Sequence, residues 1–406
     1  MTGAVLVLAV LAATPGRTIP VAPGTAIATV GAALARAADG DTILVHAGVY
    51  HESRLNVTRR VAILGRDMPV LDGGGDPVLL ITADSVTVEG LVIRNVAASF
   101  TDDRAAIRLS NITGCTIRDN VIDDTFFAIY AARSSDCLIA GNRITGTGRS
   151  ETGNANAIHL YNTRGFVVQG NEVRGHRDGI YLEFGRHALI RDNVSTGNSR
   201  YGLHFMYSDS CEYRGNTFQG NRAGIAVMYS RSVAMIGNTF ADATGPAAYG
   251  LLLKEIRDSR LEDNHFTGNT VALSVEGSDR LLARANRFER NGWAVRLYAD
   301  AEDGRFEGNE FTGNAFDVVT NSRSSSTRFA GNFWDRYEGY DLDRDGVGDV
   351  PFRPVRLFGL IVEQHPAAVI LLNSLLVTLL DTAERVAPVL TPELPLDTAP
   401  LMRWRS

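Results

Sequence analysis

Short stretches of alternating apolar and polar residues, each followed by a polar turn, recur along most of the chain. Each turn carries an asparagine, as in "CTIRDN" at Asn120 or "CEYRGN" at Asn216. The asparagines of this series are Asn95, Asn120, Asn142, Asn171, Asn193, Asn216, Asn238, Asn264, Asn286, Asn309 and Asn332. They are separated by 25, 22, 29, 22, 23, 22, 26, 22, 23 and 23 residues. A period near 22 residues is typical of one coil of a solenoid.

A second series of apolar residues keeps the same period, and each member lies 13 residues before an asparagine. Its members are Ile107, Ile129, Ile158, Ile180, Leu203, Ile225, Leu251 and Leu273. The longer intervals therefore indicate insertions, around "TGRSETGNAN" and "DATGPAAY". A large apolar residue also follows the later asparagines by two positions, at Phe218, Phe240, Phe266, Phe288 and Phe311.

Three short strands of period two in each coil predict an all-β fold, a parallel β-helix over residues 21–340. Its inward residues stack from coil to coil, and its asparagines are expected to stack as well and to bridge the turns through their amides.

The open ends of a solenoid must be covered, because an exposed strand edge invites aggregation. Near the N-terminus, Thr25 is placed as an N-cap, and Ile27, Val30, Leu34 and Ala38 share one helical face. This pattern predicts an N-terminal capping helix. At the other end, Trp334 in "GNFWDRY" stands where the repeats stop, and a C-terminal tail with helical and extended parts follows.

Composition narrows the class of protein. The chain has 406 residues, of which 45% are hydrophobic and 21% are charged, as in a folded protein. A net charge of -6 gives no electrostatic footprint for nucleic acid, so no nucleic-acid partner is expected. The apolar run from Ala4 to Ala13 favours a signal peptide over residues 1–20 and a periplasmic location, although no positive charge precedes the run.

Three cysteines are too few for a disulfide scaffold. Cys115, Cys137 and Cys211 each lie five residues before a repeat asparagine, at an inward position, and we predict small buried core residues. Because Cys115 and Cys137 fall on adjacent coils about 5 Å apart, a disulfide between them is the alternative.

A soft-metal pattern occurs in "GLHFMYSDS" and its repeat "GIAVMYSRS". If Leu203 and Ile225 point inward, His204, Met206 and Met228 point outward. Met206 and Met228 share one register, so their strands stack them about 5 Å apart. Thioethers favour Cu(I) over zinc, calcium or magnesium. His159, in the register of His204 two coils away, is a further candidate ligand, and the alternative for the whole set is an ordinary surface or protein-contact patch.

A second metal pattern is the Asp-rich loop 341–352, "DLDRDGVGDVPF". Its carboxylates fall at positions 1, 3, 5 and 9 of an EF-hand-like loop, with Gly346 at position 6. Position 12 is Phe352, where a bidentate glutamate would belong. The loop is predicted either to bind Ca²⁺ or to be an acidic turn, and the candidate ligands are Asp341, Asp343, Asp345 and Asp349.

The C-terminal segment 353–406 contains an apolar run from Ala367 to Leu380, 14 residues long. A bilayer span needs about 20 residues, so the run does not cross a membrane unaided. A helix that is apolar nearly all round must be buried against the solenoid or in a partner. We predict a docking element, whose contact residues are Ile370, Leu371, Leu372, Leu375, Leu376 and Leu379.

Many parallel β-helices act on acidic polysaccharides, so a carbohydrate-active lyase, hydrolase or epimerase is the alternative function. A hydrolase needs paired carboxylates on one outer face. The outward positions of the coils offer single acids such as Glu183 or Asp178. The acidic loop lies after the last repeat, away from any groove along the coils. A non-enzymatic function is therefore favoured.

Several segments together resemble the NosD family of periplasmic maturation proteins for nitrous oxide reductase. They are "GIYLEF", "GLHFMYSDS", "AVMYSRS", "GNFWDRYEGYDLDRDGVGDVPF", "ERVAPVLTPE" and "PLMRW", and the resemblance covers about residues 20–405. Residue by residue, the match falls on His204, Met206, Tyr207, Met228 and Tyr229.

The resemblance implies a right-handed β-helix that works with an ABC transporter to build the copper-sulfide centre of the reductase. It implies that Cu(I) arrives from a copper chaperone and is handed to nitrous oxide reductase. The C-terminal segment would dock on the membrane subunit of the transporter, so that membrane contact is made through a partner.

Overall fold

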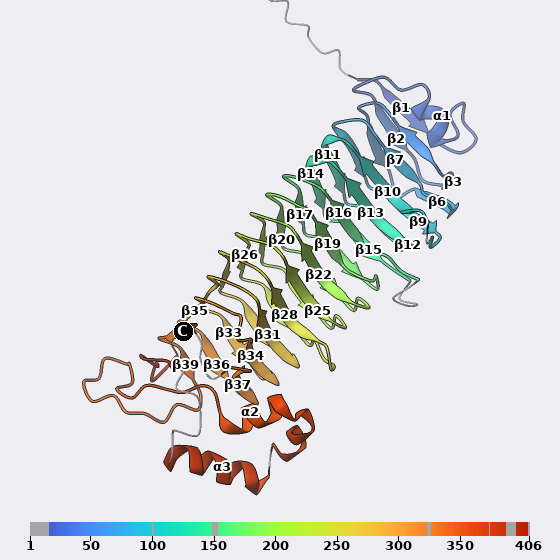
Figure 1. Cartoon of the computed structure of the whole chain (residues 1–406). Coiled ribbons are helices and arrows are strands. Elements are labelled where there is room, and N and C mark those ends of the chain that lie inside the picture. The colour runs from blue at the N-terminus through green and yellow to red at the C-terminus, as the bar shows by residue number, and fades with distance from the viewer. Residues whose placement is uncertain are drawn as a thin grey trace, which may run out of the picture.

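The chain winds into a solenoid of three parallel β-sheets around one core (Figure 1). The computed structural model describes residues 16–99, 101–147, 153–322, 326–372, 374–386 and 395–404. Each full coil gives one strand to each sheet, so a strand pairs with the strands one coil before and one coil after it. The predicted parallel β-helix is confirmed. Most of the predicted signal peptide lies outside the described residues, and Thr18–Val21 already form the first strand.

The sheets are built as follows. The first consists of β1 Thr18–Val21, β2 Thr42–Val45, β5 Ala62–Gly65, β8 Val86–Glu89, β11 Thr113–Arg118, β14 Ser135–Ala140, β17 Val167–Gln169, β20 Leu189–Arg191, β23 Glu212–Arg214, β26 Ala234–Ile236, β29 Arg260–Glu262, β32 Leu282–Arg284, β35 Arg305–Glu307 and β38 Arg328–Ala330. The second consists of β4 Leu55–Val57, β7 Leu79–Ile81, β10 Ala105–Ser110, β13 Phe127–Ala132, β16 Ile158–Tyr161, β19 Ile180–Glu183, β22 Tyr201–Met206, β25 Gly224–Met228, β28 Tyr249–Lys254, β31 Val271–Glu276, β34 Trp293–Leu297 and β37 Phe316–Thr320. The third consists of β3 Val49–His51, β6 Val70–Gly75, β9 Val92–Val96, β12 Val121–Thr125, β15 Arg143–Thr145, β18 Glu172–Arg174, β21 Val194–Thr196, β24 Thr217–Gln219, β27 Thr239–Ala241, β30 His265–Thr267, β33 Arg287–Glu289, β36 Glu310–Thr312 and β39 Phe333–Trp334.

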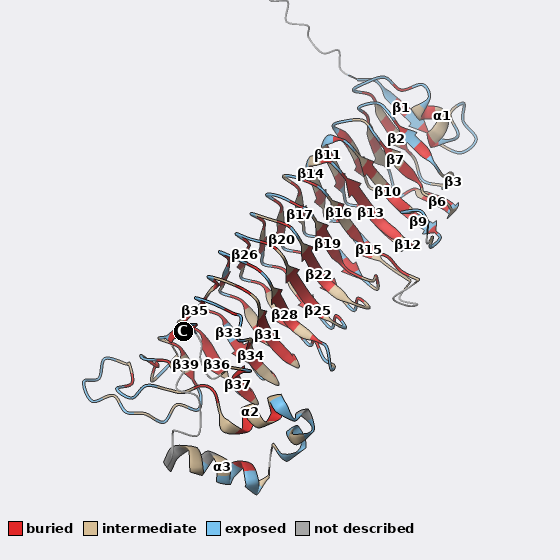
Figure 2. Ribbon diagram, viewed as in Figure 1, coloured by how far each residue is buried: buried red, intermediate tan, exposed pale blue. Residues whose placement is uncertain are grey.

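Buried residues run along the strands of the whole solenoid (Figure 2), and their apolar members form one core. The apolar series predicted from the 13-residue spacing lies in the second sheet and is buried throughout. The phenylalanines that follow the later asparagines stack in the third sheet, with ring centroids of Phe266 and Phe288 4.8 Å apart. Their column ends on Trp334, 4.1 Å from Phe311. Full burial of each such side chain stabilises the fold by roughly 1.5–3 kcal/mol.

The asparagines of the turns form a continuous ladder from Asn120 to Asn332, as predicted. At a typical step, Nδ2 of Asn264 donates to Oδ1 of Asn286 over 2.9 Å, and the backbone N–H of Asn264 donates to the same oxygen over 3.0 Å. The second amide hydrogen of Asn264 serves backbone carbonyls, including that of Met235 at 2.9 Å. The ladder thus pairs polar groups that the turns bury.

Asn95 does not belong to this ladder, so that part of the prediction is wrong. Its Nδ2 donates to Asp72 Oδ1 over 2.8 Å, and its backbone is left-handed, with φ 63°. Leu91 occupies the ladder position, where its N–H donates to Asn120 Oδ1 over 3.1 Å. In this coil the asparagine lies within β9 and follows the turn, which the sequence spacing alone does not distinguish.

The N-terminal end is covered by a helix, α1 Val30–Leu34, which is shorter than predicted. Thr29, and not Thr25, is its N-cap and accepts a hydrogen bond from the N–H of Ala32. Glu52 of the next segment accepts hydrogen bonds from two further N–H groups of the first turn, at 2.7 and 2.8 Å. These contacts satisfy donors that a helix start leaves unpaired, and they place the cap against the first coils.

The C-terminal end carries three helical elements, α2 Leu357–Gln364, the 3-10 helix η1 Pro366–Leu371 and α3 Leu375–Val386. Phe316 of the last coil packs with Phe358, Val362 and Val377 of these helices. Residues 395–404 then return to the solenoid and pair with its last strands. Among the described residues, no helix is long and apolar enough to span a membrane.

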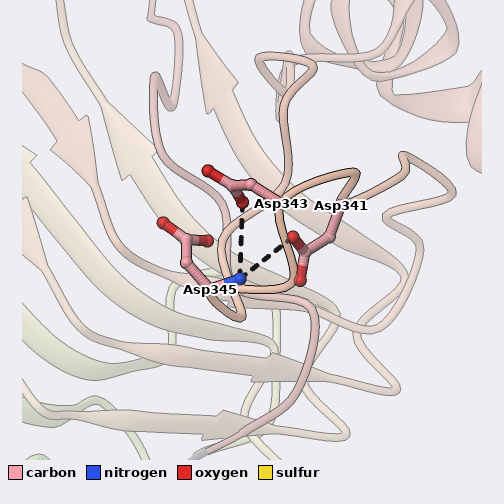
Figure 3. A group of neighbouring side chains, drawn as sticks. All are labelled: Asp341, Asp343 and Asp345. Atoms are coloured by element: carbon pink, nitrogen blue, oxygen red, sulfur yellow. Dashed lines mark hydrogen bonds between the residues drawn. The ribbon is translucent and has the colours of Figure 1, made fainter.

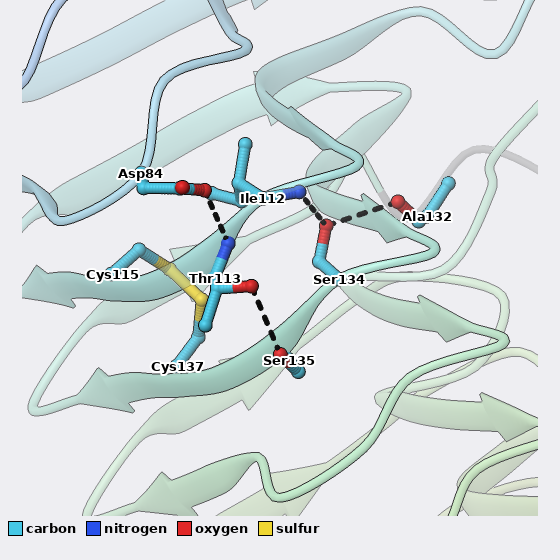
Figure 4. The surroundings of a disulfide bond; sticks show 8 residues. All are labelled: Asp84, Ile112, Thr113, Cys115, Ala132, Ser134, Ser135 and Cys137. Carbon is cyan, nitrogen blue, oxygen red and sulfur yellow. Dashed lines mark hydrogen bonds between the residues drawn. A yellow bond between two sulfur atoms is a disulfide. The ribbon is translucent and has the colours of Figure 1, made fainter.

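Cys115 of β11 and Cys137 of β14 form a disulfide between adjacent coils (Figure 4). Their Cα atoms lie 4.5 Å apart because the two strands pair in register at these residues. All three cysteines are buried, as predicted, and for Cys115 and Cys137 the alternative of a disulfide is what the structure shows. Cys211 is a buried free thiol. Alignment of two inward cysteines by strand register is enough to bring the sulfur atoms together.

Replacing both Cys115 and Cys137 with alanine is expected to lower the free energy of unfolding by about 3 kcal/mol. The bond closes a loop across a sequence separation of 22 residues, and cross-linking such a loop restricts the unfolded chain by about that amount. Urea unfolding followed by circular dichroism measures the change. Cys211→Ala is the matched control because it removes a thiol at the equivalent repeat position, and an equal loss in that variant would contradict a cross-link effect.

Candidate functional site

The two methionines of the predicted soft-metal pattern lie side by side on the outside of the second sheet. Met206 ends β22, Met228 ends β25, and the two pair directly across the strands. Leu203 and Phe205 point inward and are fully buried, whereas both methionines are half-buried. The predicted outward direction of Met206 and Met228 is therefore what the structure shows.

His204 also faces outward, but other side chains cover it, so the expected exposed imidazole is wrong. Its exposure is 5%, and its ring lies between those of Tyr181 and Tyr201, with centroids 4.8 and 4.7 Å away. The turn that precedes β19 brings Asp178 beside the imidazole, and Arg200, from the turn that precedes β22, pairs with Asp178. Alternation along the strand predicts the direction of a side chain but not what covers it.

Asp178 is the buried charge beside His204. It has 0% exposure and accepts hydrogen bonds from Arg200, one of them from Nε over 2.8 Å. Burial alone would raise the pKa of Asp178, but the hydrogen bonds from Arg200 and the nearby imidazole of His204 lower it to about 2. An ionised carboxylate therefore stands beside the imidazole at neutral pH.

The ring nitrogens of His204 lack hydrogen-bond partners in the described part of the chain. Its Nδ1 lies 3.5 Å from Asp178 Oδ2, which is at the outer limit of a hydrogen bond. Neither this nitrogen nor Nε2 has a hydrogen-bond partner among the described residues. A buried imidazole nitrogen without a partner is available to a metal ion or to a ligand.

Tyr181 connects this histidine to the methionines. Its hydroxyl donates to Met206 Sδ over 3.4 Å. Burial raises the pKa of Tyr181, and Glu183 acts in the same direction, so the phenol keeps its proton. Tyr181, Asp178 and Arg200 were not predicted as site residues. One signal was available, because Asp178 and Arg200 carry opposite charges 22 residues, one coil, apart.

His159 lies on the other side of Tyr181 from His204. The two ring-to-ring distances are 4.7 and 4.8 Å, so the tyrosine ring fills the space between the imidazoles. Burial, with a smaller contribution from Arg177, lowers the pKa of His159 to about 3, and the ring is neutral. The structure does not bring His159 to the two methionines, and its role as a ligand stays a prediction.

The Asp-rich loop brings three of its four carboxylates together (Figure 3). Oxygens of Asp341, Asp343 and Asp345 lie within 4.8 Å of one another. The N–H of Asp345 donates to both neighbouring aspartates, at 3.2 and 3.4 Å, and Gly346 makes the expected turn with φ 88°. Asp349 instead accepts from the N–H of Leu342 over 2.7 Å.

Phe352, at position 12 of this loop, packs at the C-terminal end of the solenoid and helps to cover it. Its ring packs against Trp334 and Tyr337, with centroids 5.2 and 5.9 Å away. This apolar role explains why no carboxylate stands at position 12. Ca²⁺ binding by the loop stays a prediction.

The predicted docking residues lie on η1 and α3, and most of them are exposed. Ile370 is 87% exposed, Leu375 84% and Leu379 66%, and Leu371 and Leu376 are also open to solvent. Leu372 differs, because it packs against the small core between the helices and the last coil. The run is not one helix: it is divided between η1 and α3.

Comparison with known proteins gives relatives along most of the chain. A family model described as "Periplasmic copper-binding protein (NosD)" matches residues 147–339. A protein of Pseudomonas aeruginosa named "Probable ABC transporter binding protein NosD" is 31% identical over 354 residues, 82% of each chain. A protein of the same name from Stutzerimonas stutzeri is 28% identical, over 80% of this chain and 78% of the relative.

Solved structures share the solenoid at low sequence identity. A mannuronic acid specific polysaccharide family 6 lyase from human gut microbiota has a TM-score of 0.60 at 14% identity, over 87% of this chain and 94% of the lyase. A GH87 α-1,3-glucanase of Streptomyces thermodiastaticus has a TM-score of 0.59 at 15% identity, over 73% and 64%. PfbA, a surface adhesin of Streptococcus pneumoniae, reaches 0.54 at 12% identity, over 71% and 82%. Enzymes and an adhesin share this fold, so these similarities show the fold alone.

Proposed function

This chain belongs to the NosD family, and from that premise we propose that it is a periplasmic copper-binding protein that works with an ABC transporter. More specifically, it binds Cu(I) delivered by a copper chaperone and hands it over during assembly of the copper-sulfide centre of nitrous oxide reductase. The chain acts as a binding protein in this process and not as an enzyme.

The observation that carries this proposal is the direct pairing of Met206 with Met228 on the outer face of the solenoid. Two thioethers on adjacent strands are soft donors, and His204, whose imidazole also suits copper, stands two residues from one of them. Such donors suit Cu(I) and discriminate against the hard cations Ca²⁺ and Mg²⁺. The residues present therefore fit the metal that the family name specifies.

Partial burial of the two methionines suits transfer of the metal to another protein. One side of the pair is backed by the sheet and by Tyr181, whose hydroxyl contacts Met206 Sδ. The other side is open to solvent. A second protein can therefore approach a bound ion directly and exchange ligands with it.

The exposed apolar residues of η1 and α3 support the proposed contact with the transporter. Contiguous apolar surface of this kind marks interaction sites on otherwise soluble folds. In this proposal Ile370, Leu375 and Leu379 lie in the contact with the membrane subunit.

The alternative of a carbohydrate-active enzyme finds less support in the same site. Asp178 is one of the acids that such an enzyme would need to present to a substrate. It is fully buried and held by Arg200, where it can support His204 but cannot reach a sugar. Turnover of a uronic acid polymer by the purified chain would favour the alternative.

The double substitution Met206→Leu and Met228→Leu tests the copper site. Leucine keeps the volume and removes both sulfur atoms, so the fold is expected to be retained. Titration of Cu(I) in competition with a chromophoric chelator is expected to show a loss of affinity of roughly a hundredfold, corresponding to about 2.7 kcal/mol. Met68→Leu with Met402→Leu is the matched control, since it also removes two methionines, and an unchanged affinity in the first variant would remove the site.

A further inference from the structure

A turn position directly after the strands of the second sheet carries aromatic residues in a strained backbone conformation. The position is left-handed in successive coils, at Asn111, Arg133, Asn162, Phe184, Tyr207, Tyr229, Glu255 and Gly277. Asparagine and glycine adopt this conformation readily, but a bulky aromatic residue does so only at an energetic cost. The turn itself does not require Phe184, Tyr207 or Tyr229. Backbone strain of this kind often marks a functional surface.

The three aromatic rings stack along the outside of the solenoid. Phe184 and Tyr207 have centroids 5.3 Å apart and planes inclined by 11°, and Tyr207 and Tyr229 are 5.0 Å apart at 15°. Tyr161 meets the edge of this stack at 6.0 Å. Phe184 is 44% and Tyr207 45% exposed. Because the ring faces are occupied by one another, the stack presents edges and hydroxyl groups to solvent.

A groove of ≈ 730 Å³ runs beside this stack and is lined by Tyr161, Phe184 and Tyr207. Three arginines complete its lining, Arg133, Arg164 and Arg186, and no carboxylate of the described chain lines it. Arg164 and Arg186 sit on adjacent coils as paired turn residues. Adjacent coils of a parallel sheet bring the backbones of these two residues about 5 Å apart.

The same turn position continues along the coils with Asp209, which pairs with Arg186, and then with Arg231 and Arg257. Arg231 lies 3.4 Å from the carboxylate of Asp209 on the preceding coil. The side chains of Arg164 and Arg186 make no hydrogen bond or ion pair that involves the rest of the described chain. Two positive side chains that rise from neighbouring coils without an ion-pair partner attract an anionic surface.

We propose that this groove and the stack Phe184–Tyr207–Tyr229 form the docking surface for a carboxylate-rich face of a second protein. Aromatic ring edges carry partial positive charge, so the stack and the arginines favour the same kind of partner. Aromatic residues, methionine and arginine are also the types enriched at the centres of protein interfaces. Binding of a polysaccharide by stacking would require open ring faces, and the faces between Phe184, Tyr207 and Tyr229 are occupied by one another.

The position of the surface relates it to copper transfer, and in this respect the inference rests on the proposed function. Met206 and Met228 directly precede Tyr207 and Tyr229 in the chain. A protein seated on the stack therefore has its surface next to the two thioethers. The docking partner is accordingly the protein that delivers Cu(I) to this pair or receives it.

Site-specific photo-crosslinking tests the surface. A benzophenone amino acid placed at Phe184 or Tyr207 of the full-length chain, in cells of the source organism, is expected to give one defined protein adduct. The crosslinked peptide of the partner, identified by mass spectrometry, is expected to contain several Asp or Glu residues. Val194 is the matched control position, because it is exposed on the same coil but in the third sheet.

Charge reversal gives the second part of the test. Arg164→Glu with Arg186→Glu is expected to reduce the adduct by roughly tenfold or more, since like charges then face each other. Arg174→Glu with Arg222→Glu changes the net charge equally outside the groove and is expected to leave the adduct unchanged. The proposal is overturned by absence of an adduct, by equal crosslinking from Val194, by resistance to charge reversal, or by a polysaccharide as the crosslinked species.

Copper titration of the isolated Arg164→Glu and Arg186→Glu chain separates docking from metal binding. Unchanged Cu(I) affinity together with a lost adduct assigns these arginines to docking. If the double methionine variant keeps its Cu(I) affinity while the adduct still forms in a charge-dependent way, the copper proposal fails and the docking surface stands. A loss of Cu(I) affinity on charge reversal would contradict a separate docking role.

Discussion

Replacing Asn264 with alanine is expected to lower the free energy of unfolding by about 3–5 kcal/mol. Oδ1 of Asn264 accepts hydrogen bonds from the backbone N–H and from Nδ2 of Asn238, at 2.9 and 3.0 Å. Its Nδ2 donates to Asn286 and to two backbone carbonyls. Alanine leaves these buried groups without partners, and each buried polar group left unpaired costs about 1–3 kcal/mol. Urea unfolding followed by circular dichroism measures the loss.

Asn95→Ala is the matched control for this substitution. Asn95 ends the same kind of sequence motif but lies outside the ladder and is exposed, so its removal is expected to cost only about 1 kcal/mol. Asn264→Asp keeps the acceptor but places a second carboxylate oxygen against the three acceptor oxygens that Nδ2 now serves, and it is expected to cost at least as much as Asn264→Ala. A similar loss for Asn95 and Asn264 would contradict a specific contribution of the ladder.

The contrast between Asn95 and the ladder also shows how far the repeats predict the fold. Period and alternation predict which residues point inward, because each coil repeats the same constraint, and Ile107 and Phe266 lie where they were expected. An exception inside one coil is not predictable in this way. Asn95 carries the motif with a shifted register, and only the pairing of β9 with its neighbours reveals that shift.

The sequence predicted the direction of the side chains at the candidate site but not which residues would cover them. Alternation placed Met206 and Met228 on one outer face, and the register made them neighbours. His204 is covered by Tyr181 and Tyr201 and has Asp178 beside it, and Asp178 reaches it from a turn whose path a strand pattern does not describe. The sequence left the disulfide between Cys115 and Cys137 undecided for a related reason. The register aligned Cys115 with Cys137, but alignment alone does not decide between two thiols and a bond.

Replacing Asp397 with alanine is expected to release the C-terminal tail from the last coil, with a local loss of about 3–5 kcal/mol. Oδ2 of Asp397 accepts hydrogen bonds from the N–H and Nδ2 of Asn332, at 3.1 and 2.9 Å, and from Trp334 Nε1 at 2.9 Å. Asp397 thus ends the asparagine ladder. Each asparagine of the ladder accepts hydrogen bonds from one neighbour and donates to the next. The last residue has no further asparagine to which it could donate, so a carboxylate, which only accepts, suits this position. Alanine leaves three buried donors unpaired.

Hydrogen exchange is the direct measurement of this release. Residues 395–404 and the strands β38 and β39 are expected to lose protection, because the tail pairs with those strands at Phe329 and Phe333. The coils around β10–β14 are expected to keep theirs, since each coil of a solenoid contacts only its neighbours.

Removal of the tail also uncovers strand edges, so end-to-end association in light scattering is expected to rise. Asp397→Asn keeps an acceptor oxygen and is expected to lose only about 1 kcal/mol. Full protection of the tail in Asp397→Ala would show that the backbone pairs alone hold it, and that the carboxylate does not close the ladder.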